Sequence, residues 1–111
     1  MNENNIPNDF KHLESNKEPV LFGTKIRRLR VERKMVQREL AKQLHIDAPM
    51  LSKIELGVRR AKRSQVIKLA KLFKVSESEL LTLWLADGVL NAVKDDRKLG
   101  LAALKMAKKS I

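Results

Sequence analysis

From residue 20 onward, apolar residues recur every three or four positions, and no segment alternates apolar and polar residues with a period of two. The first spacing is that of one face of an α-helix, whereas alternation would indicate a half-buried strand. The sequence therefore predicts an all-α fold, with helices at about 21–34, 37–44, 48–56, 62–74 and 77–93, and a last helix that begins after Asp95 or Asp96.

Local signals support the boundaries of these helices. Asp47 and Ser76 are typical N-cap residues. Pro49 is tolerated in a first turn, where the N–H groups have no intrahelical partner. Gly57 stands where a C-terminal glycine belongs. Residues 1–19 are polar, lack periodicity and contain two prolines, so we expect a flexible N-terminal arm.

Positive charge is concentrated in one part of the chain. The 111 residues carry a net charge of +11, and residues 21–75 alone hold sixteen basic and four acidic residues. Residues 1–20 have a net charge of −2 and residues 76–111 a net charge of +1. A solvated basic surface is the ordinary explanation, but solubility does not require this segregation. The charge therefore indicates a polyanionic partner.

The sequence lacks the residues that several classes of function require. The chain has no cysteine, and its two histidines, His12 and His45, are 33 positions apart, so we expect no metal or other cofactor. There is no histidine-centred triad and no glycine-rich phosphate loop, so we expect no enzymatic activity. No apolar run approaches the roughly 18 residues of a membrane span, and the Asn-rich start is not a signal peptide. We expect a soluble, cytoplasmic protein.

The two short helices at about 37–44 and 48–56 are separated by about three residues, the layout of a helix-turn-helix. Gln37, Ala41, His45, Leu51 and Ile54 fall at offsets 0, 4, 8, 14 and 17 from the start of this unit. Further matches are Ser52-Lys53-Ile54-Glu55 before Gly57, and Val75-Ser76 before Glu79-Leu80-Leu81. In these features residues 21–81 resemble the Xre/Cro family of phage-repressor-like regulators.

The resemblance implies a five-helix repressor-like DNA-binding domain at 20–81 and a helical extension at 82–111. Two positions depart from the family pattern. His45 stands where glycine is usual in the turn, although His is among the residues enriched at positive φ. Val36 replaces the usual Ser or Thr before the glutamine and cannot cap the helix.

The resemblance also assigns roles on DNA. The N-terminal half of the helix at 48–56 is expected at the base edges in the major groove. From side-chain chemistry, Lys53 is able to reach guanine O6 or N7, and Ala48 and Pro49 are able to touch thymine methyl groups. For Ala48 and Pro49, helix initiation is the alternative. Gln37 contacts a phosphate and braces the first reading residue. The DNA-binding residues expected in all are Gln37, Arg38, Ala48, Pro49, Met50, Ser52, Lys53, Arg59, Arg60, Lys62 and Arg63.

Four of these residues lie in the run Arg59-Arg60-Ala61-Lys62-Arg63, just after the reading helix. In the family this loop follows the DNA backbone; a solvated loop is the alternative. Arg30 and Glu55 match a family pair that joins the first helix to the end of the reading helix. We expect this pair to orient the reading helix without touching a base.

The stretch from Leu80 to Leu85 is apolar on nearly all sides, so two of its faces must be buried. One face can meet the core, and a second copy of the chain is the simplest partner for the other. The predicted homodimer interface includes Leu80, Leu83, Trp84 and Val89. The alternative is that the last helix folds back and covers this face. A two-fold dimer predicts double-stranded DNA with an inverted-repeat operator as the target.

The run from Arg59 to Asp87 is similar to small bacterial regulators encoded beside DNA methyltransferases. The function expected is sequence-specific regulation of transcription of its own operon, and the similarity extends this to control of a restriction–modification system. An antitoxin or a phage-type repressor has the same DNA-binding half and stays an alternative. A protein-binding module without operator specificity is the alternative from another class.

Overall fold

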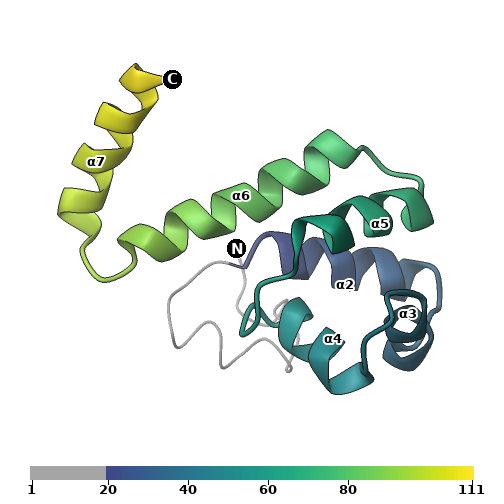
Figure 1. Ribbon diagram of the computed structural model, residues 1–111. Coiled ribbons are helices and arrows are strands. Elements are labelled where there is room, and N and C mark those ends of the chain that lie inside the picture. Colours follow the sequence, from purple (N-terminus) through teal and green to yellow (C-terminus); the bar gives the residue numbers. More distant parts are fainter. Residues whose placement is uncertain (1–19) are drawn as a thin grey trace.

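The computed structural model describes residues 20–111, which form six α-helices and no strand (Figure 1). The helices are α2 (Phe22–Glu32), α3 (Gln37–Gln43), α4 (Ala48–Glu55), α5 (Arg63–Phe73), α6 (Glu77–Val93) and α7 (Arg97–Ser110). The predicted all-α fold is confirmed, and every predicted boundary given as a residue range lies within two residues of the observed one. The expected flexible arm at 1–19 lies outside the described residues.

The predicted caps begin three of the helices. The Asp47 side chain accepts a hydrogen bond of 2.8 Å from the Met50 backbone N–H at the start of α4. Ser76 Oγ accepts one of 3.1 Å from the Glu79 N–H at the start of α6. Asp96 caps α7 in the same way. Each cap satisfies one of the N–H groups that the first turn leaves without a helical partner.

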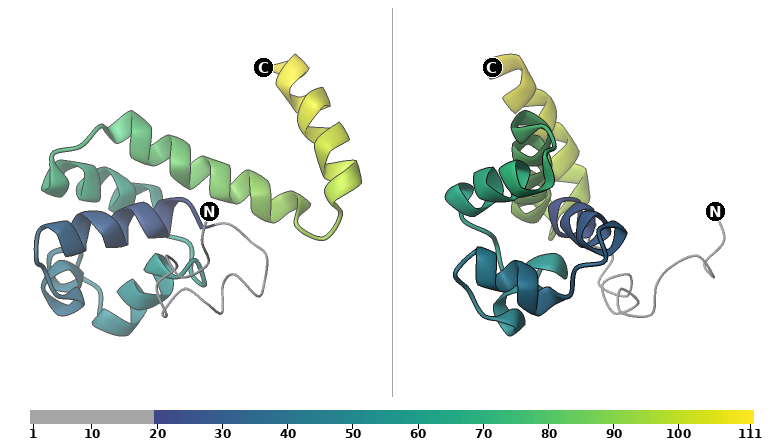
Figure 2. Two further views of the ribbon diagram at one scale, coloured as in Figure 1. Left: turned by 180° about the vertical axis from the view of Figure 1, so that it is seen from behind. Right: turned by 90° about the vertical axis from the view of Figure 1, so that its right-hand side faces the viewer.

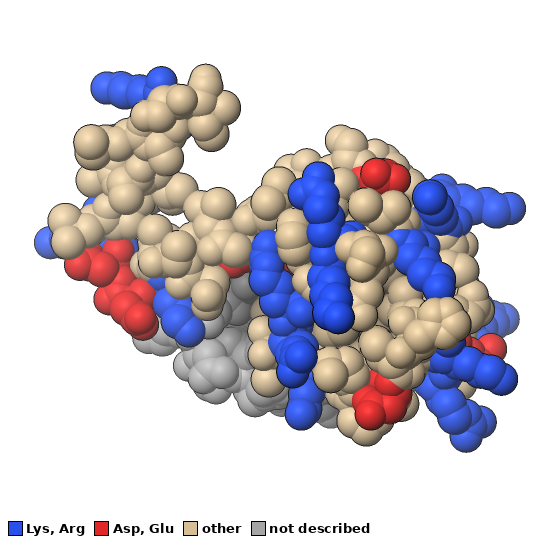
Figure 3. Space-filling model, in the orientation of Figure 1, with Lys and Arg blue, Asp and Glu red and all other residues tan. Residues whose placement is uncertain are grey.

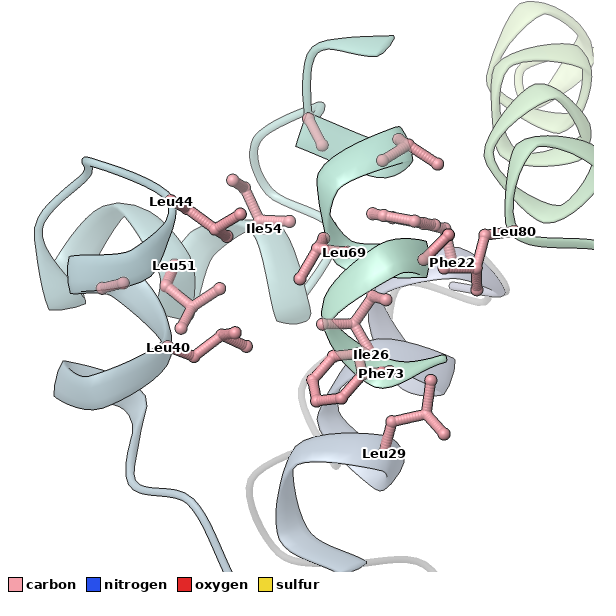
Figure 4. Close-up of a cluster of buried hydrophobic side chains, with 14 residues drawn as sticks. Phe22, Ile26, Leu29, Leu40, Leu44, Leu51, Ile54, Leu69, Phe73 and Leu80 are labelled. Carbon is pink, nitrogen blue, oxygen red and sulfur yellow. The ribbon is translucent and has the colours of Figure 1, made fainter. Parts of the chain in front are cut away.

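Helices α2 to α5 and the first half of α6 enclose one core (Figure 4). Side chains of the α3–α4 pair, such as Leu40 and Leu51, point toward Leu69 and Phe73 of α5. Leu80 of α6 completes this core and is 0% exposed. The prediction that Leu80 lies in a dimer interface is therefore wrong, because the Leu80 side chain faces the core of its own chain.

Helix α6 is joined to the rest of the chain by polar contacts as well as by packing. The two carboxylate oxygens of Asp87 accept hydrogen bonds of 2.9 Å from the backbone N–H groups of Leu21 and Phe22, at the start of α2. Trp84 Nε1 donates a bond of 2.8 Å to the Ala61 carbonyl in the α4–α5 loop. These contacts fix α6 against the start of α2 and against the α4–α5 loop. Helix α6 also continues without a break through the expected domain boundary between residues 81 and 82.

Helix α7 leaves the end of α6 at a sharp angle and extends away from the core (Figures 1 and 2). Its close contact with α6 is at Gly100, where a Cβ would lie 2.7 Å from the Val93 Cβ. Leu85 and Val89 of α6 stay 51% and 45% exposed. The alternative to a dimer was that the last helix folds back and covers this face of α6. In the described residues α7 leaves Leu85 and Val89 uncovered.

Candidate nucleic-acid interface

Helices α3 and α4 pack together across a tight turn. Ala41 in α3 is 1% exposed, so its small side chain lies within the contact between the two helices. His45 in the turn has a φ of 59°, the left-handed conformation for which the family pattern uses glycine. The Ile46 N–H bonds the Ala41 carbonyl at 3.0 Å and closes the end of α3. This is the geometry of a helix-turn-helix.

Helix α4 has one face in the core and one face in solvent. Leu51 and Ile54 are buried, whereas Pro49 and Lys53 are exposed. The remaining three predicted reading residues, Ala48, Met50 and Ser52, are half-buried. Met50, whose orientation the sequence left open, packs against the core from its half-buried position. The side chains free to reach a base edge are therefore few and short, apart from Lys53.

The C-terminal end of α4 is held by a buried hydrogen-bond network at Glu55, whose side chain is 1% exposed. The Arg30 Nε and Nη2 groups of α2 donate to its two oxygens at 2.7 and 3.0 Å. A third bond of 3.0 Å comes from the Gln37 side-chain amide at the start of α3. One carboxylate thus joins α2, α3 and α4, so the exposed face of α4 has a fixed orientation.

The Gln37 contact is one that the sequence did not indicate. The resemblance assigned Gln37 to a phosphate and to the first reading residue, whereas in the structure its amide nitrogen bonds Glu55. Arg38, the next residue of α3, is exposed. The Arg30–Glu55 pair of this network was expected from the resemblance, whereas the bond between Gln37 and Glu55, 18 positions apart on two different helices, was not.

Gly23 allows α2 to lie against the end of α4. A Cβ at this position would be 2.5 Å from the backbone carbonyl oxygens of both Ile54 and Glu55. No side chain fits at that distance, so the close approach of the two helices requires glycine here. The close approach of α2 at Gly23 and the hydrogen-bond network of Glu55 therefore both hold the C-terminal end of α4.

Cationic side chains flank α4 on the loop that follows it. Arg59, Lys62 and Arg63 are exposed, as phosphate contacts require. Arg60 is also exposed, but its guanidinium carbon lies 4.1 Å from the centre of the Trp84 ring in α6. Figure 3 shows Lys and Arg spread over the helix-turn-helix half of the face it displays, with a few acidic side chains among them and another acidic group near the α6–α7 turn.

Two short packed helices, an exposed face on the second and a cationic loop beside it define a helix-turn-helix DNA-binding protein. A family model described as a helix-turn-helix domain matches residues 23–84, more than half of the chain. The chain therefore belongs to the helix-turn-helix domain family. The comparisons with curated proteins and with solved structures gave no significant match.

Residues 20–111 offer no metal centre and no membrane-spanning element. In this part of the chain no three His, Cys, Asp or Glu residues come together in a way that would hold a metal ion. Across the same residues, no helix has the length and apolar character needed to cross a membrane.

Proposed function

We propose that this protein is a sequence-specific regulator of transcription of the Xre type, that it acts without catalysis, and that it binds an inverted-repeat operator as a homodimer. The observation that carries the proposal is the Glu55 network, which fixes α4 relative to α2 and α3 while Pro49 and Lys53 stay exposed. A reading helix must keep its orientation to distinguish base edges, because bidentate contacts tolerate little displacement.

The surface of α6 supports the dimer. Leu83 and Trp84 are half-buried, and Leu85 and Val89 are about half exposed. Leu83 and Trp84 pack against their own chain, and the Trp84 ring is covered by Arg60, so the apolar surface left open to a second copy is at Leu85 and Val89. A single reading helix buries little DNA surface, whereas two helices related by a two-fold axis enter successive major grooves about 34–36 Å apart.

Within this class we propose a regulator of its own operon that controls a restriction–modification system, because the run from Arg59 to Asp87 resembles such controllers. A phage-type repressor or an antitoxin has the same DNA-binding half. The genes beside this one distinguish the three: a methyltransferase, phage genes or a toxin gene supports the respective assignment.

The test of DNA binding is a titration of operator and random DNA at several salt concentrations, after selection of the operator from genomic fragments by gel shift. The triple variant Arg59→Ala, Lys62→Ala and Arg63→Ala should weaken binding to both DNAs. The slope of log K against log salt should fall by about 0.9 for each phosphate that the variant no longer neutralises.

The matched control removes the same charge from α7, with Lys98→Ala, Lys105→Ala and Lys108→Ala, and should leave the slope nearly unchanged. An equal fall in both variants would mean that net charge, not the loop, determines binding. A wild-type protein with no preference for any genomic fragment would refute the regulator and favour a protein-binding module.

A further inference from the structure

The loop between α4 and α5 is bonded at each end to the helix that it leaves or enters. At its start, the backbone N–H groups of Val58 and Arg59 donate hydrogen bonds of 2.9 and 3.2 Å to the Lys53 carbonyl of α4. At its end, the Lys62 N–H donates a bond of 2.8 Å to the side-chain oxygen of Gln65 in α5. These bonds fix the two ends of the loop, and residues 60 and 61 lie between them.

Residues 60 and 61 are held by α6. The Arg60 guanidinium carbon lies 4.1 Å from the centre of the Trp84 ring, which is a cation–π contact. The Nε1–H group of the same indole donates a bond of 2.8 Å to the Ala61 carbonyl. One tryptophan thus contacts two successive residues of the loop, the first through its face and the second through its edge.

Gly88, one turn after Trp84 on α6, leaves room for the Arg60 side chain. A Cβ at Gly88 would lie 3.1 Å from the Arg60 Nη2 atom and 3.3 Å from its Cζ and Nη1 atoms. Residues four positions apart lie on the same side of a helix. The guanidinium therefore rests on one side of α6, against an aromatic ring and a position without a side chain.

We infer that Arg60 is a positioning residue for DNA binding. Its guanidinium stays on the Trp84 ring in the DNA complex and holds the loop, while the other three cationic side chains of the loop neutralise phosphates. A loop that is already ordered loses less conformational freedom on binding, so this contact raises the affinity without a phosphate of its own. The inference rests on the DNA-binding function proposed above and replaces the phosphate contact that the family resemblance gave to Arg60.

A phosphate ligand and a positioning residue differ in the salt dependence of binding. Arg60→Ala should weaken binding to operator and to random DNA about two- to fivefold, which is the equivalent of the roughly 0.5–1 kcal/mol of an exposed cation–π contact. It should leave the slope of log K against log salt unchanged, because the same phosphates are neutralised in the complex. Arg59→Ala is the matched control at the neighbouring exposed arginine and should lower the slope by about 0.9.

Two results of this titration would overturn the inference. A fall of the slope in Arg60→Ala equal to that in Arg59→Ala would make Arg60 a phosphate ligand. An affinity of Arg60→Ala equal to that of the wild type would mean that the contact with Trp84 does not serve DNA binding. A role in stability alone gives this second result, because it leaves the affinity of the folded protein unchanged.

A substitution on α6 separates the position of Arg60 from its charge. Gly88→Leu keeps the arginine but points a side chain at its guanidinium, and leucine is a good helix former, so α6 should persist. This variant should weaken binding as Arg60→Ala does. The double variant should bind no more weakly than either single variant, because both substitutions remove the same contact. Additive losses would show that Arg60 acts independently of its place on α6 and would overturn the inference.

The fluorescence of the protein reports on the Trp84 ring alone, because the chain has one tryptophan and no tyrosine. Arg60→Ala should raise the constant for quenching by acrylamide, since one face of the ring loses its cover, and Arg59→Ala should not. In the wild-type complex with operator DNA, the constant should stay at or below the value of the free protein. A rise toward the Arg60→Ala value would show that the guanidinium leaves the ring on binding, and would overturn the inference.

Failure of the inference and failure of the proposed function give different results. A wild-type protein that prefers no genomic fragment refutes the regulator, while the slopes on random DNA still decide whether Arg60 contacts a phosphate. A protein that selects an operator and shows equal slopes for Arg59→Ala and Arg60→Ala refutes only the positioning role. A protein that binds no DNA refutes both.

Discussion

Substitution of Glu55 by Ala is the sharpest test of how the reading helix is held. The change removes an acceptor that is 1% exposed and that receives three hydrogen bonds, two from Arg30 and one from Gln37. Arg30 is itself only 8% exposed. In the variant its guanidinium would still donate a hydrogen bond of 2.8 Å to the Met35 carbonyl. A guanidinium would thus stay in the interior without its counterion.

Loss of one member of a buried ion pair costs about 3–5 kcal/mol, because the remaining charge is neither solvated nor paired. Small domains have a total free energy of unfolding of about 5–15 kcal/mol, so Glu55→Ala should remove a large part of it. At about 4–8 °C per kcal/mol for a domain of this size, the melting temperature should fall by at least about 12 °C.

The chain offers an exposed pair as a matched control. Lys25 Nζ lies 3.6 Å from the Glu79 carboxylate, whose side chain is 56% exposed. Glu79→Ala should cost at most about 1 kcal/mol. Both variants are measured by urea denaturation at one protein concentration, followed by circular dichroism. If Glu55→Ala costs no more than Glu79→Ala, the Glu55 network does not hold the three helices together and does not fix the reading helix.

Three smaller perturbations test other parts of the helix-turn-helix. Gly23→Ala brings a Cβ to 2.5 Å from two backbone carbonyls at the end of α4 and should destabilise the fold by about 1–3 kcal/mol in thermal denaturation. His45→Gly relieves a φ of 59° and should stabilise by about 0.5–1 kcal/mol, whereas Lys42→Gly inside α3 should destabilise by about 1 kcal/mol. Lys53→Ala should relax the preference at one base pair per half-site by about 1–3 kcal/mol, and equal losses on operator and random DNA would instead make Lys53 a phosphate ligand.

Apart from the Arg30–Glu55 pair, which the family resemblance supplied, the features that the sequence predicted well depend on residues close together in the chain. Asp47, Ser76 and Asp96 each bond an N–H three positions later, so a cap is visible as a residue type before a periodic segment. The turn at His45 was located by its offset from Gln37, although its residue type differs from the family pattern. Local geometry fixes such features, so the packing of the whole domain adds little to them.

The features that the sequence missed join distant segments. Asp87 bonds N–H groups 65 and 66 positions earlier, and Trp84 bonds a carbonyl 23 positions earlier. Whether a side chain on α6 meets such a group depends on the angle at which α6 crosses α2 and α5. Leu80 was misplaced for the same reason, because a helix that is apolar on nearly all sides does not indicate which side faces the core.

The contacts of α6 also change what counts as the DNA-binding unit. A unit that ends at residue 81 lacks the Trp84 indole, which bonds the α4–α5 loop and carries the Arg60 guanidinium on its face. It also lacks the Asp87 carboxylate, which caps the start of α2. The loop that flanks the reading helix is therefore anchored by residues beyond the expected boundary, and the family match reaches Trp84. The smallest unit that retains these contacts extends to Asp87, so α6 as far as Asp87 is part of the structure that holds the helix-turn-helix.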